Sequence, residues 1–193
     1  MKKHTIFLAT AMMLIVNLGY AADTNDAASR SYNSGRYVET FKLTLPLALK
    51  GSANEQYNLG AMYFQGQGVA QNYAEAFRWC KLAALQGHAK AQTVLASMYF
   101  TGKGVNEDHT EATKWFKLAA EQGQQAAQLA LGLNYANEKD YSKAYMWLNL
   151  SAINGDKKSV LSRDVVAKIM TEAQLIQGQR LAQECLARNY KDC

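Results

Sequence analysis

The side chains that could do acid–base or metal chemistry are few and lie far apart in this sequence. After the first 22 residues the chain has two histidines, His88 and His109, and an acidic pair, Glu107–Asp108. Neither histidine has a cysteine at a spacing typical of zinc sites, and both fall at the boundaries of expected helices. We interpret them as solvated loop residues and the acidic pair as a complement to the positive end of a helix. No metal site is expected.

Motifs of the common catalytic classes are missing from the sequence. It contains no S-x-x-K, no G-x-S-x-G and no P-loop. Gly66-Gln67-Gly68 could suggest a phosphate loop, but it lies between two expected helices and its counterpart later in the chain is deleted. The sequence therefore predicts no enzyme, no catalytic residue and no cofactor.

The three cysteines suggest one disulfide bond and one buried free thiol. Cys185 and Cys193 are eight positions apart near the C-terminus, and an oxidising compartment would permit a disulfide between them. We predict this bond, which would hold the tail against the last helix. Cys80 is interpreted as a small buried apolar side chain rather than a reactive thiol.

The first 21 residues have the layout of a secretory signal peptide. Lys2 and Lys3 precede an apolar run from Ile6 to Leu18, and Gly19-Tyr20-Ala21 offers small residues for a peptidase. The run is short for a membrane span, although an uncleaved anchor remains an alternative. No later segment is apolar enough to span, so we expect a periplasmic or secreted protein with no membrane span after cleavage.

The charge balance excludes a strongly basic protein. The net charge of the whole sequence is +5, and without Lys2 and Lys3 there are 19 basic residues against 16 acidic ones. The basic residues are scattered, so the sequence does not predict binding to nucleic acid or anionic lipid.

The elements that must position these residues repeat along the chain. Residues 53–88 (repeat 1) align with residues 89–124 (repeat 2) without a gap, and MYFQGQGV in one becomes MYFTGKGV in the other. Residues 125–157 (repeat 3) keep the pattern but lose four residues between Tyr135 and Trp147. Because the third copy lacks the glycine loop, we interpret that loop as a connector rather than a site.

Each repeat reads as helix, turn, helix. In the second half of repeat 1, Ala76, Trp79, Cys80, Ala83 and Ala84 share one helical face, and repeat 2 has the same pattern. Gly87, Gly123 and Gly155 stand where a helix needs a left-handed closing residue. One helix pair cannot bury its apolar face alone, whereas stacked pairs can, so we predict an all-α solenoid.

The two ends of the array are expected to differ from its centre. Residues 22–52 read as a degenerate helix pair, with a first helix near 24–34. Residues 158–193 read as C-terminal capping helices, the first over about 156–170 and the second opening on a capping box at Thr171 and Gln174. On the second helix we expect Leu175, Ala182, Cys185 and Leu186 to face inward.

The recurring residues carry a family resemblance. Leu59-Gly-x-x-Tyr63-x-x-Gly66-x-Gly68-Val69, followed by Ala76-x-x-Trp79-x-x-x-Ala83-Ala84-x-x-Gly87, resembles the SEL-one-like repeat family, a relative of the tetratricopeptide repeats. Repeat 3 departs from the family pattern by its deletion, and repeat 2 has Ala96 where the pattern prefers glycine. The resemblance implies a right-handed superhelix of antiparallel helix pairs with a concave groove, and an adaptor that binds other proteins, in exported bacterial members often at the cell envelope.

A groove can be located on the first helices by subtracting the recurring residues. Three stripes of variable residues remain, each at i, i+4 and i+7. They comprise Asn58, Met62 and Gln65 in repeat 1, Val94, Met98 and Thr101 in repeat 2, and Ala130, Asn134 and Asn137 in repeat 3. Amides and methionines suit an extended peptide, although these positions could also be ordinary surface.

Two functions are therefore open at this point. The first is a non-catalytic module that binds a protein or peptide of unknown identity in the cell envelope. The alternative is a cell-wall or beta-lactam hydrolase or penicillin-interacting protein, as exported cysteine-rich relatives have been described. Those relatives carry a cysteine pair in each repeat, whereas Cys80 has no partner within its own repeat. The first function is the one we expect.

Overall fold

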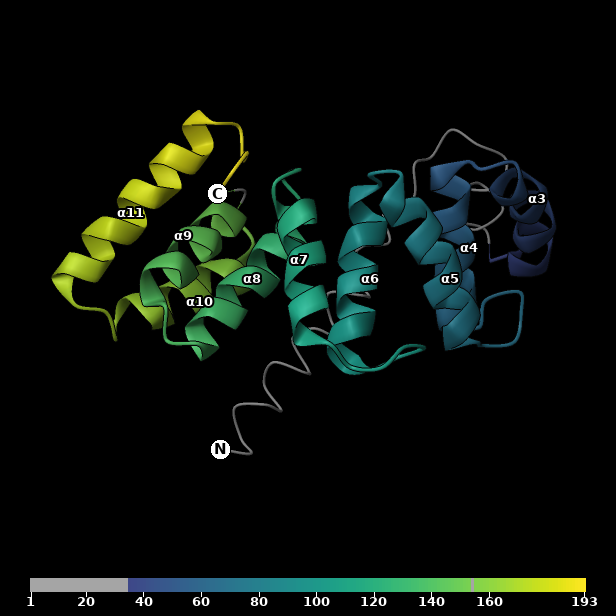
Figure 1. Ribbon diagram of the computed structural model, residues 1–193, viewed down its shortest axis with the longest axis horizontal. Helices are drawn as coiled ribbons and strands as arrows, with labels where there is room; N and C mark the ends of the chain where they lie inside the picture. Colours follow the sequence, from purple (N-terminus) through teal and green to yellow (C-terminus); the bar gives the residue numbers. More distant parts are fainter. Residues whose placement is uncertain (1–34, 154) are drawn as a thin grey trace. The chain divides into compact units, whose positions relative to one another are not determined.

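The computed structural model describes residues 35–193 except residue 154, and the regular structure in that part of the chain is α-helical (Figure 1). Two compact units divide it, with described parts of 35–115 and 116–193, and the division falls inside one helix. The predicted leader (1–21) and the expected helix near 24–34 lie outside the described residues. Within those residues, no helix combines the length and the apolar character that a membrane crossing requires.

Unit 35–115 is a row of helices that pack on their neighbours in the chain (Figure 1). Its members are α3 (Tyr37–Leu49), α4 (Ala53–Gln65), α5 (Tyr73–Leu85), α6 (Ala89–Thr101) and the start of α7 (His109–Ala120). Helix α4 packs against both α3 and α5, and α5 packs against α6. A first helix such as α4 is therefore enclosed on two sides, which limits the surface that it can present.

Unit 116–193 is organised around one central helix. After the end of α7 it comprises α8 (Gln125–Asn137), α9 (Tyr141–Ala152), α10 (Lys157–Ala167) and α11 (Glu172–Ala187). Helix α9 packs against α8, α10 and α11. The predicted capping box opens α11, because the Thr171 hydroxyl accepts from the Gln174 backbone N–H and the Gln174 side chain accepts from the Thr171 N–H.

Small residues let the two helices of repeat 1 approach closely. Ala76, Cys80 and Ala83 of α5 are completely buried, as their shared face predicts. A Cβ added to Gly60 of α4 would lie 2.6 Å from the Cys80 Sγ, which is closer than real contacts allow. The contact between α4 and α5 therefore depends on glycine at this position.

A buried glutamine joins each repeat to the helix before it. The fourth residue of each first helix donates its side-chain N–H to a backbone carbonyl in the last turn of the preceding second helix. The bonds run from Gln56 to Ala48, from Gln92 to Ala84 and from Gln128 to Ala120, each at 3.2 Å. Buried backbone carbonyls need such partners, so these glutamines fix how one pair meets the next.

The glycine loop packs against the helix pair before it. Gly68 and Gly104 have φ angles of +70° and +75°. A Cβ at Gly68 would overlap the backbone carbonyl of Tyr37, and one at Gly104 would overlap that of Tyr73. Both carbonyls belong to the first residue of the second helix in the preceding pair. The loop is thus a structural connector that needs glycine for both its conformation and its closeness to this helix.

Candidate interaction surface

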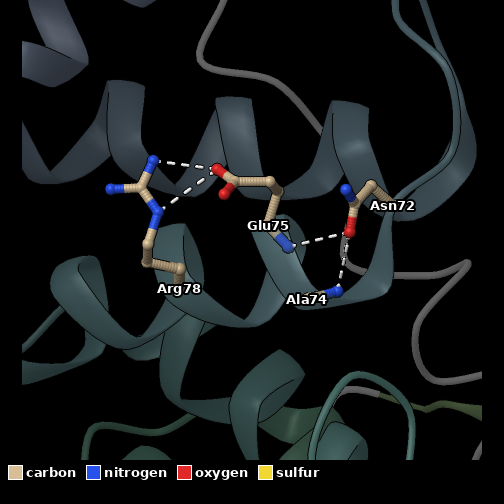
Figure 2. A network of polar contacts seen from close by, with 4 residues as sticks. All are labelled: Asn72, Ala74, Glu75 and Arg78. Atoms are coloured by element: carbon tan, nitrogen blue, oxygen red, sulfur yellow. Dashed lines mark hydrogen bonds and ion pairs between the residues drawn. The ribbon is translucent and has the colours of Figure 1, made fainter.

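Polar residues at the helix starts are used by the scaffold itself. Figure 2 shows Asn72, whose side chain accepts hydrogen bonds from the backbone N–H groups of Ala74 at 3.0 Å and Glu75 at 3.1 Å. One turn along α5, the Glu75 carboxylate pairs with the Arg78 guanidinium at 2.8 Å. The guanidinium lies 4.3 Å from the centre of the Trp79 ring. These residues hold the start of α5, so they are poor candidates for a binding site.

The structure corrects part of the predicted groove. Met62, Val94, Met98 and Ala130 are buried, so these four side chains cannot contact a partner. The reason for Met62 lies in the packing of α4 between α3 and α5. Val94 and Met98 belong to the buried cluster that also contains Tyr57 and Cys80. Met62 and Met98 are identical residues 36 positions apart, so this recurrence was a sign of the core that the predicted stripes overlooked, whereas Val94 and Ala130 are variable positions that also pack in the core.

Five polar members of the predicted stripes retain access to solvent. In unit 35–115 these are Asn58, Gln65 and Thr101, which are half-buried; in unit 116–193 they are Asn134, which is half-buried, and Asn137, which is exposed. The Asn58 amide donates to Glu55 at 3.2 Å, and the Thr101 hydroxyl donates to the Ser97 carbonyl at 2.8 Å. The Asn58 amide and the Thr101 hydroxyl can still accept hydrogen bonds, and the Gln65 amide can donate and accept them. These are the groups that a polypeptide could use in unit 35–115.

Sequence reasoning missed an aromatic and cationic cluster next to these residues. The rings of Phe64 and Tyr73 meet edge to face, with centroids 5.1 Å apart. The Lys103 ammonium from the loop of repeat 2 lies 5.2 Å and 5.4 Å from the two ring centroids. Phe64 and Phe100 hold equivalent positions 36 residues apart, which could have marked the position. The lysine ties the second glycine loop to repeat 1.

The histidines do structural work at helix starts. His88 is the N-cap of α6 rather than the solvated loop residue that we expected: its Nδ1 accepts from the Ala91 N–H at 3.1 Å, and its ring stacks on Tyr57. His109 is the first residue of α7, and its Nε2 lies 2.8 Å from a Glu107 carboxylate oxygen. Asp108 accepts from the Glu111 N–H, which confirms its role at the positive end of a helix.

The cysteines behave as the sequence predicted. Cys185 and Cys193 form a disulfide, with Cα atoms 5.4 Å apart. Cys80 is a free thiol, and its complete burial raises the pKa of the thiol to about 12. A thiol with that pKa is a poor nucleophile at neutral pH. Disulfides persist outside the cytoplasm, so this bond is compatible with an extracytoplasmic protein.

Potential metal ligands do not gather into a cluster in the described part of the chain. Within residues 35–193, residue 154 excepted, no group of three or more His, Cys, Asp and Glu side chains could hold a metal ion. The polar groups described above are mainly hydrogen-bond donors and acceptors on helices and helix starts.

Comparisons with known proteins agree with this architecture. The sequence model of the family described as Sel1 repeat matches residues 56–88, 89–124 and 125–156. A Sel1 repeat protein from Oxalobacter formigenes, known from its crystal structure, is similar with a TM-score of 0.70 and 29% identity, over 84% of this chain and 74% of that one. No curated protein sequence matches the chain.

A second solved structure shares the fold. It is c5321, a protective antigen present in uropathogenic Escherichia coli strains that displays an SLR fold. The similarity has a TM-score of 0.59 and 23% identity, covering 93% of this chain but 47% of that one, so this chain spans less than half of the antigen's length. Together the helices and these neighbours place the described part of the chain in the all-α class of helical-repeat solenoids.

Proposed function

Because this chain belongs to the Sel1 repeat family, whose repeats generally mediate protein–protein interaction, we propose that it is a non-catalytic module that binds another protein or peptide. The partner's identity is not encoded in the recurring residues. Those residues are common to every copy and serve the contacts between helices. Recognition therefore falls to exposed positions that vary between copies.

The observation that carries this proposal is the structural use of the polar and reactive side chains on the helices and helix starts. The glutamines bond backbone carbonyls between repeats, His88 and Asp108 accept from the first turns of helices, and the Cys80 thiol is buried. Side chains engaged in this way hold a scaffold in place. A scaffold that presents variable polar residues is suited to binding a partner.

Within unit 35–115 we place the binding surface at Asn58, Gln65 and Thr101. They lie on the first helices α4 and α6, at the solvent-accessible ends of the predicted stripes. Side-chain amides can donate to and accept from the backbone of an extended peptide. Asn134 and Asn137 offer the same chemistry on α8 of the other unit.

A photo-crosslinking experiment in the native cell tests this surface. A benzophenone amino acid at Gln65 should capture a defined partner, and replacing Asn58 and Thr101 with alanine in that protein should reduce the yield at least about fivefold. Gln179→Ala, an exposed glutamine of α11, is the matched control and should leave the yield unchanged. Equal yields from all three proteins would refute the surface assignment.

We also propose that the protein works in the cell envelope, outside the cytoplasm. Two features support this location: the Cys185–Cys193 disulfide and the leader-like sequence of the first 21 residues. Alkylating free thiols in intact cells before lysis should leave Cys185 and Cys193 unmodified. Quantitative alkylation of both cysteines by a membrane-permeant reagent, but not by an impermeant one, would place the protein in the cytoplasm.

A further inference from the structure

Helix α10 occupies the position of a first helix in a fourth repeat. Each first helix from α6 onward follows a left-handed glycine and an N-cap residue: Gly87 and His88 before α6, Gly123 and Gln124 before α8, and Gly155 and Asp156 before α10. Counted from the helix starts, the fifth residues are Tyr57 in α4, Leu129 in α8 and Leu161 in α10. The helices can therefore be compared position by position.

The fifth position is buried in the first helices that precede α10. Tyr57 is 6% exposed, stacks on His88 at the start of α6 and belongs to the same buried cluster as Val94. Leu129 is 7% exposed and shares a buried cluster with Val166 of α10. In both repeats the buried cluster around this position contains residues of the second helix of the same repeat and at least one residue of the following first helix.

Helix α10 leaves the same face open, and the face is apolar. Leu161 at the fifth position and Val165 at the ninth are 65% and 62% exposed, and Ile169 in the turn that follows is 59% exposed. These residues are spaced i, i+4 and i+8, so they form one stripe. The ninth position of α4, by contrast, is the buried Ala61. The fifth and ninth positions are buried in α4 but carry exposed aliphatic side chains in α10, which indicates a surface that another helix covers.

The charged residues around the stripe indicate which kind of partner helix would bind there. Lys157, Lys158 and Lys168 are exposed and lie three to seven positions from Leu161, on its side of the helix. The acidic side chain within α10 is Asp164, which pairs with Arg163 at 2.8 Å. A second copy of this chain docked stripe to stripe would bring lysines together, whereas a helix with acidic flanks would complement them.

We propose that the stripe of Leu161, Val165 and Ile169 binds an amphipathic helix of a partner protein that carries aliphatic residues flanked by acidic ones. The partner helix would cover the fifth position of α10, whose counterparts Tyr57 and Leu129 are buried in the earlier repeats. This inference rests on the proposed function as a binding module, but it uses a surface different from Asn58, Gln65 and Thr101.

Binding of a designed peptide to the full chain tests the proposal. The probe is a fluorescein-labelled amphipathic helix of about 18 residues, with leucines at i, i+3, i+4 and i+7 and glutamates on both flanks. We expect saturable binding, measured by fluorescence anisotropy, that weakens at least about tenfold in the Leu161→Glu, Val165→Glu double variant. A peptide with lysines in place of the glutamates should not bind, and salt should weaken binding of the acidic peptide.

Control variants distinguish this site from the proposed binding surface at Asn58, Gln65 and Thr101 and from nonspecific hydrophobic binding. Leu85→Glu changes an equally exposed leucine of α5 and should leave the affinity unchanged, and circular dichroism should give the same melting curve for every variant. Asn58→Ala with Thr101→Ala should leave peptide binding intact. Loss of peptide binding in the Asn58→Ala, Thr101→Ala variant would contradict the claim that the two surfaces are separate.

Several results would overturn the proposal. They are an absence of binding, equal binding of the acidic and basic peptides, affinity unaffected by the double variant, and a Leu161-dependent dimer in sedimentation velocity at the peptide-binding concentration. Binding of the wild type to phosphatidylglycerol vesicles without binding to the peptide would assign the stripe to a lipid surface and would also overturn it. None of these results would affect the capture of a partner by crosslinking at Gln65. Failure of this proposal can therefore be distinguished from failure of the proposed function.

Discussion

At the residue scale, the most informative side chain is the glutamine at the fourth position of the first helices. Gln56, Gln92 and Gln128 are all buried, and each donates to the carbonyl eight residues earlier. Gln56 also accepts from Gln86 at 2.7 Å. The equivalent position of α10 is Val160, and here Ser151 and Ser159 form a buried hydrogen bond at 2.8 Å instead. The repeat chemistry therefore changes where the capping helices begin.

Replacing Gln92 with methionine tests the value of this bond. The volume is nearly kept, but the Ala84 carbonyl loses a buried donor, so the free energy of unfolding should fall by about 1–3 kcal/mol. Urea denaturation followed by circular dichroism measures the change. Gln179→Met on the exposed side of α11 should shift the free energy by less than about 0.5 kcal/mol. A similar loss in both variants would show that the buried bond has no special role.

Cys80 gives a prediction about reactivity. Burial raises the pKa of its thiol to about 12, so in the folded protein almost no thiolate is present at pH 8 and the sulfur is covered by α4. Ellman's reagent should therefore react with one thiol only after the protein is unfolded in urea. Rapid stoichiometric reaction of the native protein at pH 8 would contradict the burial of this side chain. The expected pH dependence has a clear sign, because raising the pH toward 12 favours the thiolate and should accelerate the reaction.

At the element scale, the sequence was a good guide to where helices begin and end and a poorer guide to which side they bury. Glycines with positive φ and capping side chains are local signals, so the expected capping box at Thr171 was found where predicted. Burial depends on neighbours that are distant in the sequence. Met62 and Met98 looked like surface residues and are buried, whereas Leu186, expected to face inward, is 41% exposed.

Helix α11 shows how one small residue fixes such a packing. Gly178 is buried, and a Cβ there would lie 3.0 Å from the Ser142 carbonyl of α9. The Ser142 hydroxyl donates to the Gln174 carbonyl at 3.2 Å. Ala182 and Cys185 complete the buried side of the helix, as predicted, and Leu175 is half-buried. The contact uses a glycine in mid-helix, a residue that propensity alone would count against the element.

The disulfide should stabilise this capping element. Cys193→Ser removes a bond that closes a short loop, and loop-closure entropy predicts a loss of about 2–3 kcal/mol. The Tyr190 ring within that loop also lies near Gly123, so freeing the tail should loosen this contact. Thermal melting with and without reductant measures the effect: the wild type should melt lower when reduced, and the variant should not respond. Identical melting of the oxidised wild type and the variant would show that the bond contributes nothing to folding.

At the scale of the whole molecule, the class of fold followed from the repeat, whereas the surface available for binding did not. A spacing of 36 residues between Gln56 and Gln92, or between Gly68 and Gly104, is visible without a structure because each residue meets the same surroundings in each copy. An exposed stripe such as Leu161 and Val165 is invisible to that method, since its aliphatic residues resemble those of a core position. The structure distinguishes it, because Leu161 and Val165 are exposed whereas their counterparts in α4, Tyr57 and Ala61, are buried.

A solenoid should also respond locally to damage, because each repeat contacts its neighbours and little else. Gly60→Ala would force a Cβ against the Cys80 Sγ, and overpacking of this kind costs about 1–3 kcal/mol. Hydrogen exchange followed by mass spectrometry should show faster exchange in α4 and α5, with unchanged protection in α9 and α11. Asn54→Ala, at an exposed position of α4, should leave all four helices unchanged. Uniform acceleration of all four helices in the Gly60→Ala variant would instead mean that the chain unfolds as one cooperative block, and stability could not then be treated as a sum over neighbouring repeats.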